Sequence, residues 1–316
     1  MRQKWLDILK GIGIIAVVVG HVMNWRYVYS FHMPLFFLIS GYTFHVRENE
    51  VEWFVKCCRR YLLPYFSFML SFSLYTLLLT GKRLSLYKIL YGGSELLGIY
   101  GTFWFITVLF LSLLLLNVIV KRHISIYASI IVCLLLSYIF QYEEVSVRWN
   151  AQIVPMALAY MLMGYEYKIN VEMMDSIVKS GKYRYLLQAL ILCACIVPVF
   201  FLQIRIDMKQ TDFGVPVLSL IVSLLICLGF SLFSKWLESR KTIVAGVLIF
   251  IGKASLVIMF MHQFFKEVLF DVGIEKRSIR FVLAILLPTA IYYLLEKNRL
   301  TKACFWGNNS SIIIVV

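Results

Sequence analysis

The 316-residue chain is poor in charged residues, which excludes the usual composition of a soluble domain. Only 15% of its residues are charged, 61% are hydrophobic, and the mean hydropathy is +0.83. A soluble globular domain carries about a quarter of its residues as charged side chains. This balance therefore indicates an integral membrane protein.

Cysteine and acidic residues are also scarce. The seven cysteines have neither the spacing of a metal site nor that of a disulfide framework, so we expect no metal. Seventeen acidic residues stand against 31 basic ones, a formal net charge of +14. Because the basic residues are divided among many short loops, we expect them to meet membrane lipids and not nucleic acid.

What the sequence does contain is a series of apolar runs of about 17 to 23 residues, long enough to cross a roughly 30 Å hydrocarbon layer as helices. We predict an all-α integral membrane protein with about ten transmembrane helices in one polytopic domain, residues 1–316. Gly81–Thr102 is expected to be an interfacial or re-entrant loop. The expected spans lie near Ile8–Asn24, Tyr27–Val46, Tyr61–Thr80, Phe103–Val120, Ile124–Phe140, Ala151–Tyr167, Tyr185–Gln203, Val215–Phe233, Ile243–Phe265 and Ile279–Glu296.

The distribution of Lys and Arg sets the expected orientation. With a cytoplasmic N-terminus, eighteen of the 31 basic residues fall in inner loops, eleven fall in outer loops, and Lys10 and Lys253 fall within spans. The positive-inside rule therefore places both termini in the cytoplasm. The N-terminal run lacks a small-residue cleavage site, so we expect it to be retained as the first span.

Two ionisable residues in the first span are the strongest candidates for chemistry. Lys10 and His21 are eleven residues apart, so they share a helix face and are separated by roughly 16 Å along the axis. Lys10 could simply snorkel to the interface, and His21 could simply bond to another helix. Alternatively, His21 accepts a proton at neutral pH, a role suited to imidazole.

The second span begins FHMPLFFLISGY, with His32 at its outer end. A histidine there is common in the interface belt. Ser40 and Gly41 predict a close approach of another helix, with a bend at Gly41 as a further possibility.

Lys56, Arg59 and Arg60 precede the third span on the expected inner side. They fit either a positive-inside anchor or a phosphate clamp, since Lys56 and Arg59 are one turn apart.

Two later stretches contain the remaining candidates. GTFWFI, which includes Trp104, is typical of an interfacial aromatic belt. IGKASLVIMFMH repeats the lysine-to-histidine pattern of the first span with Lys253 and His262, where His262 fits packing better than catalysis.

Taken in order, these stretches resemble the acyltransferase-3 family of membrane O-acyltransferases, which decorate bacterial surface glycans. The resemblance covers nearly the whole chain. In that family a basic residue and a histidine separated by ten positions mark the first helix, here Lys10 and His21, and a basic-x-x-basic pair precedes the third, here Lys56 and Arg59. Lysine replaces the usual arginine at position 56 and lacks its bidentate fork. The stretches are LDILKGIGIIAVVVGH, FHMPLFFLISGY, KCCRRYLLPYF, FWFI, ALAYMLMGYEY and IGKASLVIMFMH.

The resemblance implies a stand-alone, multi-pass enzyme of the bacterial cytoplasmic membrane. Its acyl donor would be acetyl-CoA or another acyl-CoA, and its acceptor a hydroxyl of a surface or lipid-linked glycan. The resemblance leaves open a monomer or a homodimer. His21 would act as general base, with a covalent acetyl-histidine as the rival route. The residues implied to hold the donor phosphates are Lys10, Lys56, Arg59 and Arg60, and those implied to orient the sugar or the oxyanion are His32, Ser40, Trp104 and His262.

Two other functions stay open at this point. A transporter or lipid-linked glycan flippase would also explain polar groups at membrane depth, although not the basic pair before the third span. A non-catalytic sensor or scaffold is the third. Stabilisation by coenzyme A would distinguish the enzyme from a transporter.

Overall fold

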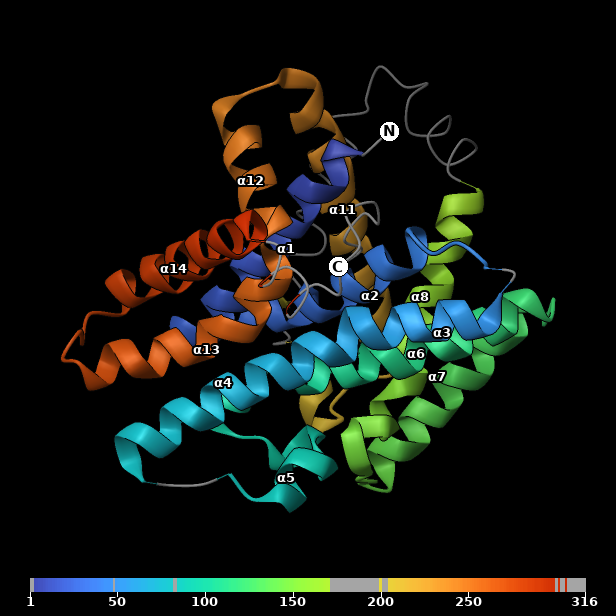
Figure 1. Ribbon diagram of the computed structural model, residues 1–316. Coiled ribbons are helices and arrows are strands. Elements are labelled where there is room, and N and C mark those ends of the chain that lie inside the picture. Colours follow the sequence, from blue (N-terminus) through green and yellow to red (C-terminus); the bar gives the residue numbers. More distant parts are fainter. Residues whose placement is uncertain are drawn as a thin grey trace.

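The computed structural model describes residues 3–47, 49–81, 84–170, 199–200, 204–298, 301 and 305. The regular structure of these residues is helical, apart from one isolated β-bridge between Asp207 and Asp212 (Figure 1). The all-α prediction is therefore confirmed for the described part. Its helices are α1 (Lys4–Val22), α2 (His32–Tyr42), α3 (Glu50–Cys57), α4 (Leu63–Thr80), α5 (Leu86–Tyr91), α6 (Trp104–Lys121), α7 (Ile126–Tyr142), α8 (Val154–Ile169), α11 (Leu218–Arg240), α12 (Ile243–Lys253), α13 (Ser255–Asp271) and α14 (Arg277–Lys297).

Several of these helices have the length and hydropathy of membrane spans. Within the described residues five stretches qualify, and the bent pair α12 and α13 makes a sixth if it counts as one span. This supports an integral membrane protein. Ten spans and cytoplasmic termini stay predictions, and the expected span Tyr185–Gln203 lies almost wholly outside the described residues. The five stretches are Lys4–Val22, Glu50–Thr80, Gly98–Lys121, Leu218–Arg240 and Arg277–Lys297.

Two expected spans are not single straight helices. Tyr27–Val46 contains the short 3-10 helix η1 (Arg26–Ser30), a break at Phe31, and then α2, which has 11 residues and is only about 16 Å long. Ile243–Phe265 bends by 77° between α12 and α13. Lys253 and His262 therefore do not share one helix axis as Lys10 and His21 do. Hydropathy does not reveal such breaks, because backbone groups at a break can be satisfied inside the protein.

The basic residues before the third span lie on a helix and not in a loop. α3, the π-helical segment η2 (Cys58–Leu62) and α4 follow one another without a break. Asn49 caps the start of α3 by accepting a 3.0 Å hydrogen bond from the backbone N–H of Glu52. Arg59 and Arg60 thus lie on the π-helical turn, and their position on the inner side of the membrane stays a prediction.

The described part of the region Gly81–Thr102 consists of short helices and turns, and its end, from Gly98, continues into the candidate span Gly98–Lys121. An interfacial or re-entrant position of this region stays a prediction. Its described part contains α5 and two 3-10 turns, η3 (Gly93–Glu95) and η4 (Gly98–Tyr100). The Trp149 indole N–H donates to the Leu90 carbonyl at 3.1 Å, and the Tyr100 hydroxyl lies 3.4 Å from the Ser73 hydroxyl. These contacts fasten the loop to the 3-10 helix η5 (Arg148–Ile153) and to α4.

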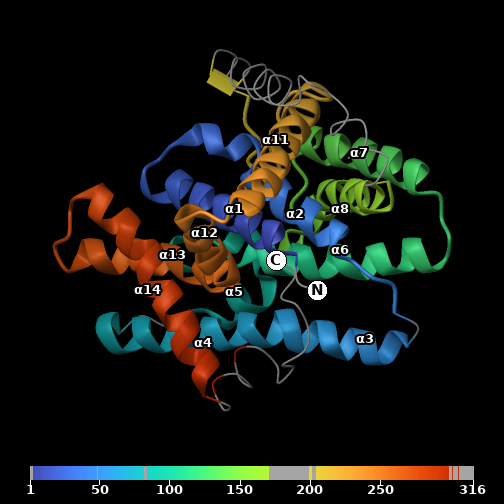
Figure 2. The same cartoon turned by 90° about the horizontal axis from the view of Figure 1, so that it is seen from above.

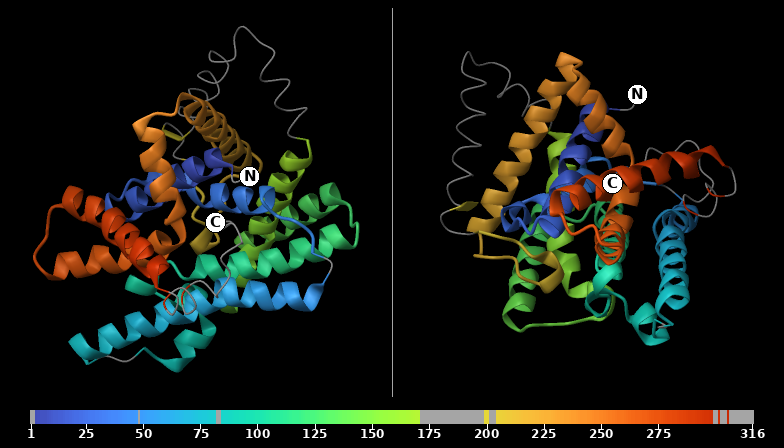
Figure 3. Two further views of the ribbon diagram at one scale, coloured as in Figure 1. Left: turned by 45° about the horizontal axis from the view of Figure 1, so that its top comes forward. Right: turned by 90° about the vertical axis from the view of Figure 1, so that its left-hand side faces the viewer.

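α1 and α2 lie in the middle of the bundle, where Figures 2 and 3 show them enclosed by other helices. Glycines bring each of them into backbone contact with one neighbour. A Cβ at Gly252 of α12 would lie 1.8 Å from the Asp7 carbonyl oxygen of α1, and one at Gly41 of α2 would lie 1.8 Å from the Met161 carbonyl oxygen of α8. Gly11 and Gly164 make the reciprocal contacts. The predicted close approach at Gly41 is therefore confirmed.

Candidate active site

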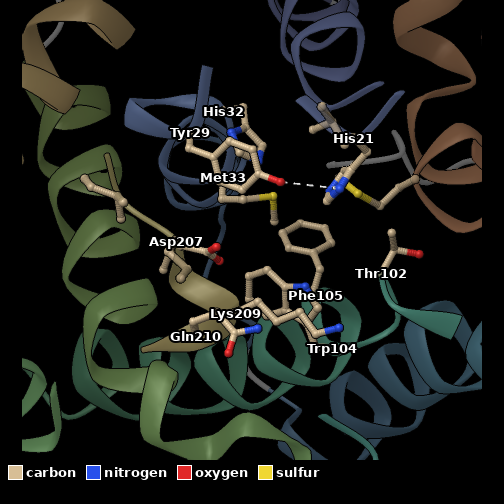
Figure 4. A pocket seen from close by; sticks show the side chains of 14 residues that line it. His21, Tyr29, His32, Met33, Thr102, Trp104, Phe105, Asp207, Lys209 and Gln210 are labelled. Carbon is tan, nitrogen blue, oxygen red and sulfur yellow. Dashed lines mark hydrogen bonds between the residues drawn. The ribbon is translucent and has the colours of Figure 1, made fainter. Parts of the chain in front are cut away.

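A cavity of about 170 Å³ lies at the C-terminal end of α1 (Figure 4). Five separate parts of the chain form its wall: the end of α1, the η1–α2 junction, the start of α6, the segment 206–210, and Met259 of α13. Only the tertiary fold brings these parts together. The lining residues are Val17, His21, Tyr29, His32, Met33, Thr102, Trp104, Phe105, Ile206, Asp207, Met208, Lys209, Gln210 and Met259.

His21 occupies the last turn of α1, half-buried, between a tyrosine and a second histidine. Its Nδ1 lies 3.4 Å from the Tyr29 hydroxyl, and its ring centroid lies 5.2 Å from that of His262. In the tautomer in which Nδ1–H donates to the tyrosine oxygen, Nε2 keeps its lone pair. His21 can then act as a base at the cavity, while Tyr29 holds the orientation of the ring.

His32 and His262 are fixed by their own helices. In each, Nδ1 lies 2.8 Å from a backbone carbonyl oxygen, that of Val28 for His32 and that of Ile258 for His262. A carbonyl oxygen only accepts hydrogen bonds, so each Nδ1 carries the proton and each Nε2 is an acceptor. Nε2 of His262 is fully buried and has no hydrogen-bond partner among the described residues. Such an atom beside His21 is a natural partner for a polar group brought by substrate or water.

Asp207 and Lys209 bring opposite charges to the far wall. Figure 4 shows the Asp207 carboxylate turned into the cavity, and Lys209 Nζ donates to the Leu96 carbonyl at 2.9 Å. Burial raises the pKa of Asp207, with Asp212 acting in the same direction, and burial lowers the pKa of Lys209.

A second, polar compartment of about 380 Å³ adjoins the first. Its wall includes Tyr29 and Asp207, which line both compartments. The other lining residues are Gly20, Asn24, Arg26 and Arg205. No group of three or more His, Cys, Asp or Glu residues in the described part of the chain is arranged to hold a metal ion.

The structure brings four of the predicted site residues together. His21, His32 and Trp104 line the cavity, and His262 packs its ring against His21. Trp104 is buried, as are its neighbours Phe103 and Phe105, so the expected aromatic belt at this position is wrong. These aromatics form part of the wall and core around the cavity.

Ser40 and Lys10 lie away from the cavity. The buried Ser40 hydroxyl donates to the Phe36 carbonyl at 2.8 Å within α2, so it has a structural partner. Lys10 is buried on α1, roughly 16 Å below His21 by the rise of the helix, and does not line the cavity. His21 and Lys10 thus open onto no common cavity within the described residues.

The three cations of α3 and η2 are separate from the cavity as well. Lys56 and Arg59 are exposed, and Lys56 forms an ion pair with Glu52 one turn before it. The Arg60 guanidinium lies 5.5 Å from the centroid of the Tyr61 ring. Lys56 and Arg59 are therefore accessible to a soluble anion, but the structure brings none of the three cations to His21.

Sequence reasoning missed Tyr29, Asp207 and Lys209. Tyr29 falls inside a run interpreted as a span, where tyrosine is unremarkable. Asp207 and Lys209 fall in a short polar connection, DMKQTD, next to the span Val215–Phe233. The one signal that could have singled out Asp207 is its place in a short polar connection between two apolar runs.

The fold and the cavity define a class: an integral membrane protein with a histidine-centred site at the end of its first helix. A family model described as an acyltransferase domain matches residues 3–297, nearly the whole chain. The chain therefore belongs to the acyltransferase-3 family, and the resemblance found in the sequence is confirmed. Comparison with curated proteins and with solved structures found no match.

Proposed function

We propose that this membrane acyltransferase moves an acetyl or similar short acyl group from a cytosolic acyl-CoA to a hydroxyl of a surface or lipid-linked glycan. The proposed location is the cytoplasmic membrane of a bacterium. The observation that carries the proposal is the position of His21, which lies on the cavity wall with a tyrosine and a second histidine against its ring. Family membership supports the acyl transfer itself.

His21 acts as the general base in this proposal. Nε2 accepts the proton of the acceptor hydroxyl as its oxygen attacks the thioester carbonyl, and the carbon–sulfur bond then breaks. The proton passes from the imidazolium to the departing thiolate, which regenerates neutral His21 and releases coenzyme A as the thiol. The rival route forms an acetyl-histidine first and transfers the acetyl group from it to the hydroxyl.

His32, Trp104 and His262 support the reacting groups in this scheme. Nε2 of His32 is an acceptor on the cavity wall and suits a hydroxyl of the acceptor sugar. His262 lies behind His21, and its ring supports the orientation of the His21 ring. The Trp104 ring lies in the cavity wall and offers a flat apolar surface to a sugar ring. Ser40 has no role in the proposed reaction, because its hydroxyl already donates a hydrogen bond to a backbone carbonyl within α2.

Cationic residues hold the phosphates of the donor. Lys56 and Arg59 are exposed on consecutive turns, where charge-assisted contacts to phosphate are open to them. Arg60 and Lys10 complete the proposed donor set. The roughly 16 Å between Lys10 and His21 is comparable to an extended pantetheine arm, which would bring the thioester to the imidazole.

The test uses purified protein in lipid nanodiscs, radiolabelled acetyl-CoA and a mixture of bacterial glycans. His21→Ala should lose transfer by about a hundredfold or more, the usual contribution of a catalytic base, while its affinity for coenzyme A stays that of the wild type. Arg59→Ala should weaken coenzyme A binding and leave transfer at saturating donor nearly unchanged.

His45→Ala is the matched control, because His45 is exposed and bonds only to the Thr43 carbonyl in the described part of the chain. Wild-type turnover by His21→Ala would reject the base assignment. A wild-type protein that coenzyme A does not stabilise against heat would reject the enzyme and favour a transporter.

A further inference from the structure

The outer polar compartment next to the His21 cavity has no part in the reaction as proposed so far. Five of its six lining residues are polar or charged, and the sixth is glycine. Tyr29 and Asp207 line both compartments, so these two side chains form the boundary between the outer compartment and the His21 cavity. The compartment therefore belongs to the approach to His21.

Cations predominate along this approach. Arg26, Arg205 and Lys209 line the two compartments together with a single carboxylate, Asp207, which gives a formal balance of +2 with neutral histidines. Lys209 and Asp207 lie at the inner end. The two arginines lie in the outer compartment, so the excess of positive charge is there.

Neither arginine is fully occupied by a protein partner. Arg26 is exposed and forms no ion pair with a carboxylate among the described residues. Arg205 contacts Asp212 through Nε alone, at 3.4 Å, and its side chain is 51% exposed. The terminal nitrogens of both guanidinium groups are thus open to another acceptor. A guanidinium presents its N–H groups in a planar fork that matches a carboxylate or a phosphate.

We propose that Arg26 and Arg205 bind an oxyanion of the acyl acceptor, a carboxylate or a phosphate, and so hold its hydroxyl at His21. This rests on the proposed function and adds the chemical class of the acceptor. A carboxylate would come from an acidic sugar, and a phosphate from the carrier of a lipid-linked glycan. Asp207, at the boundary, then accepts a hydrogen bond from a sugar hydroxyl that enters the inner cavity.

The experiment measures binding of matched probes to the full chain in nanodiscs. Methyl glucuronide and methyl glucoside differ only at C6, which is a carboxylate in the first and a hydroxymethyl group in the second. Glucose 1-phosphate supplies a soluble phosphate, and undecaprenyl diphosphate supplies a lipid-bound one. Anionic probes should bind the wild type at least about tenfold more tightly than methyl glucoside, an advantage that high salt weakens. Arg26→Ala with Arg205→Ala should abolish this preference, whereas Arg148→Ala, which removes an exposed arginine outside both compartments, should keep it.

Comparison of the four probes shows which kind of oxyanion the site binds. A preference for methyl glucuronide identifies an acidic sugar, and a preference for undecaprenyl diphosphate identifies a lipid-linked acceptor. Equal binding of neutral and anionic probes, or a preference that survives the double substitution, overturns the proposal. So does a double variant that loses acetyl-CoA affinity instead, because the arginines would then hold the donor.

Acetyl transfer measured on the same samples keeps the two proposals distinguishable. Transfer without anion preference refutes the oxyanion site and leaves the transferase standing. Arginine-dependent anion binding by a protein that neither binds acetyl-CoA nor transfers acetyl refutes the transferase and leaves the anion site.

Discussion

The backbone contact between α1 and α12 makes a sharp prediction about a single methyl group. A Cβ at Gly252 would lie 1.8 Å from the Asp7 carbonyl oxygen, whereas ordinary contact begins at 3.4 Å, a shortfall of about 1.6 Å. The opposing atoms belong to the backbone, so no side-chain rotation can relieve the clash. In Gly252→Ala the two helices must therefore move apart.

The size of the effect follows from the geometry. Overpacking of a well-packed interior costs about 1–3 kcal/mol and occasionally more, and a backbone clash of this depth belongs at the upper end. α1 also carries His21, whose ring packs against His262 of α13 next to α12. Displacement of α1 should therefore reduce acetyl transfer as well as stability.

Gly246 of the same helix supplies the control. It is exposed, and a Cβ there would meet no atom within 4 Å. Alanine is the better helix former, so Gly246→Ala should stabilise α12 by about 0.5–1 kcal/mol. The same substitution, six residues apart on one helix, thus has opposite expected signs.

Thermal unfolding in detergent, followed by tryptophan fluorescence, measures both variants against the wild type. The apparent melting temperature should fall for Gly252→Ala and stay level or rise for Gly246→Ala. Equal melting temperatures for the two variants would refute the backbone contact between α1 and α12, and with it the packing that positions His21.

Three further predictions concern the site and the donor residues. Burial raises the pKa of Asp207, so the ionised carboxylate destabilises the fold at pH values above the ordinary carboxyl pKa. Asp207→Asn should therefore raise the melting temperature at pH 7, and this gain should disappear below about pH 4. An equal gain at both pH values would contradict this. His262→Phe removes a buried acceptor without a described partner, so it should fold at least as stably as the wild type yet transfer acetyl more slowly, and unchanged kinetics would exclude His262 from the site. Glu52→Gln releases Lys56 from its ion pair and should lower the KM for acetyl-CoA about twofold at low salt, an effect that a KM titration at high salt should no longer show.

The long spans could be predicted from sequence, and the breaks could not. α1, α11 and α14 follow apolar runs of the length that a membrane requires, so hydropathy alone locates them. The bend after Lys253 and the short α2 interrupt runs that are just as apolar. Their conformation depends on which neighbours receive the backbone groups at the break, and that information lies in distant segments.

The candidate site divides in a similar way. His21 and His32 could be predicted because an ionisable side chain within an apolar run is rare and needs a reason. Tyr29 and Asp207 could not, because tyrosines at helix ends and charged residues in connections are common. Tyr29 and Asp207 become candidates only because the tertiary fold brings both to the wall of the His21 cavity. No local sequence pattern predicts this.

The contact between α1 and α12 also restricts how a donor could reach His21. Gly11 lies against the Leu248 carbonyl oxygen, where a Cβ would be only 2.3 Å away, so that face of α1 has no room for a pantetheine arm. At 100° per residue, Lys10 and His21 point roughly 80–100° away from Gly11, both toward the same side of the helix. The face that joins Lys10 to His21 is also packed, because Lys10, Ile14 and Val17 on it are all buried. An arm held at Lys10 would therefore need the helices beside this face to move apart. The arm would approach the imidazole from the N-terminal side of His21. An acceptor bound by Arg26 and Arg205 would approach it from beyond the C-terminal end of α1.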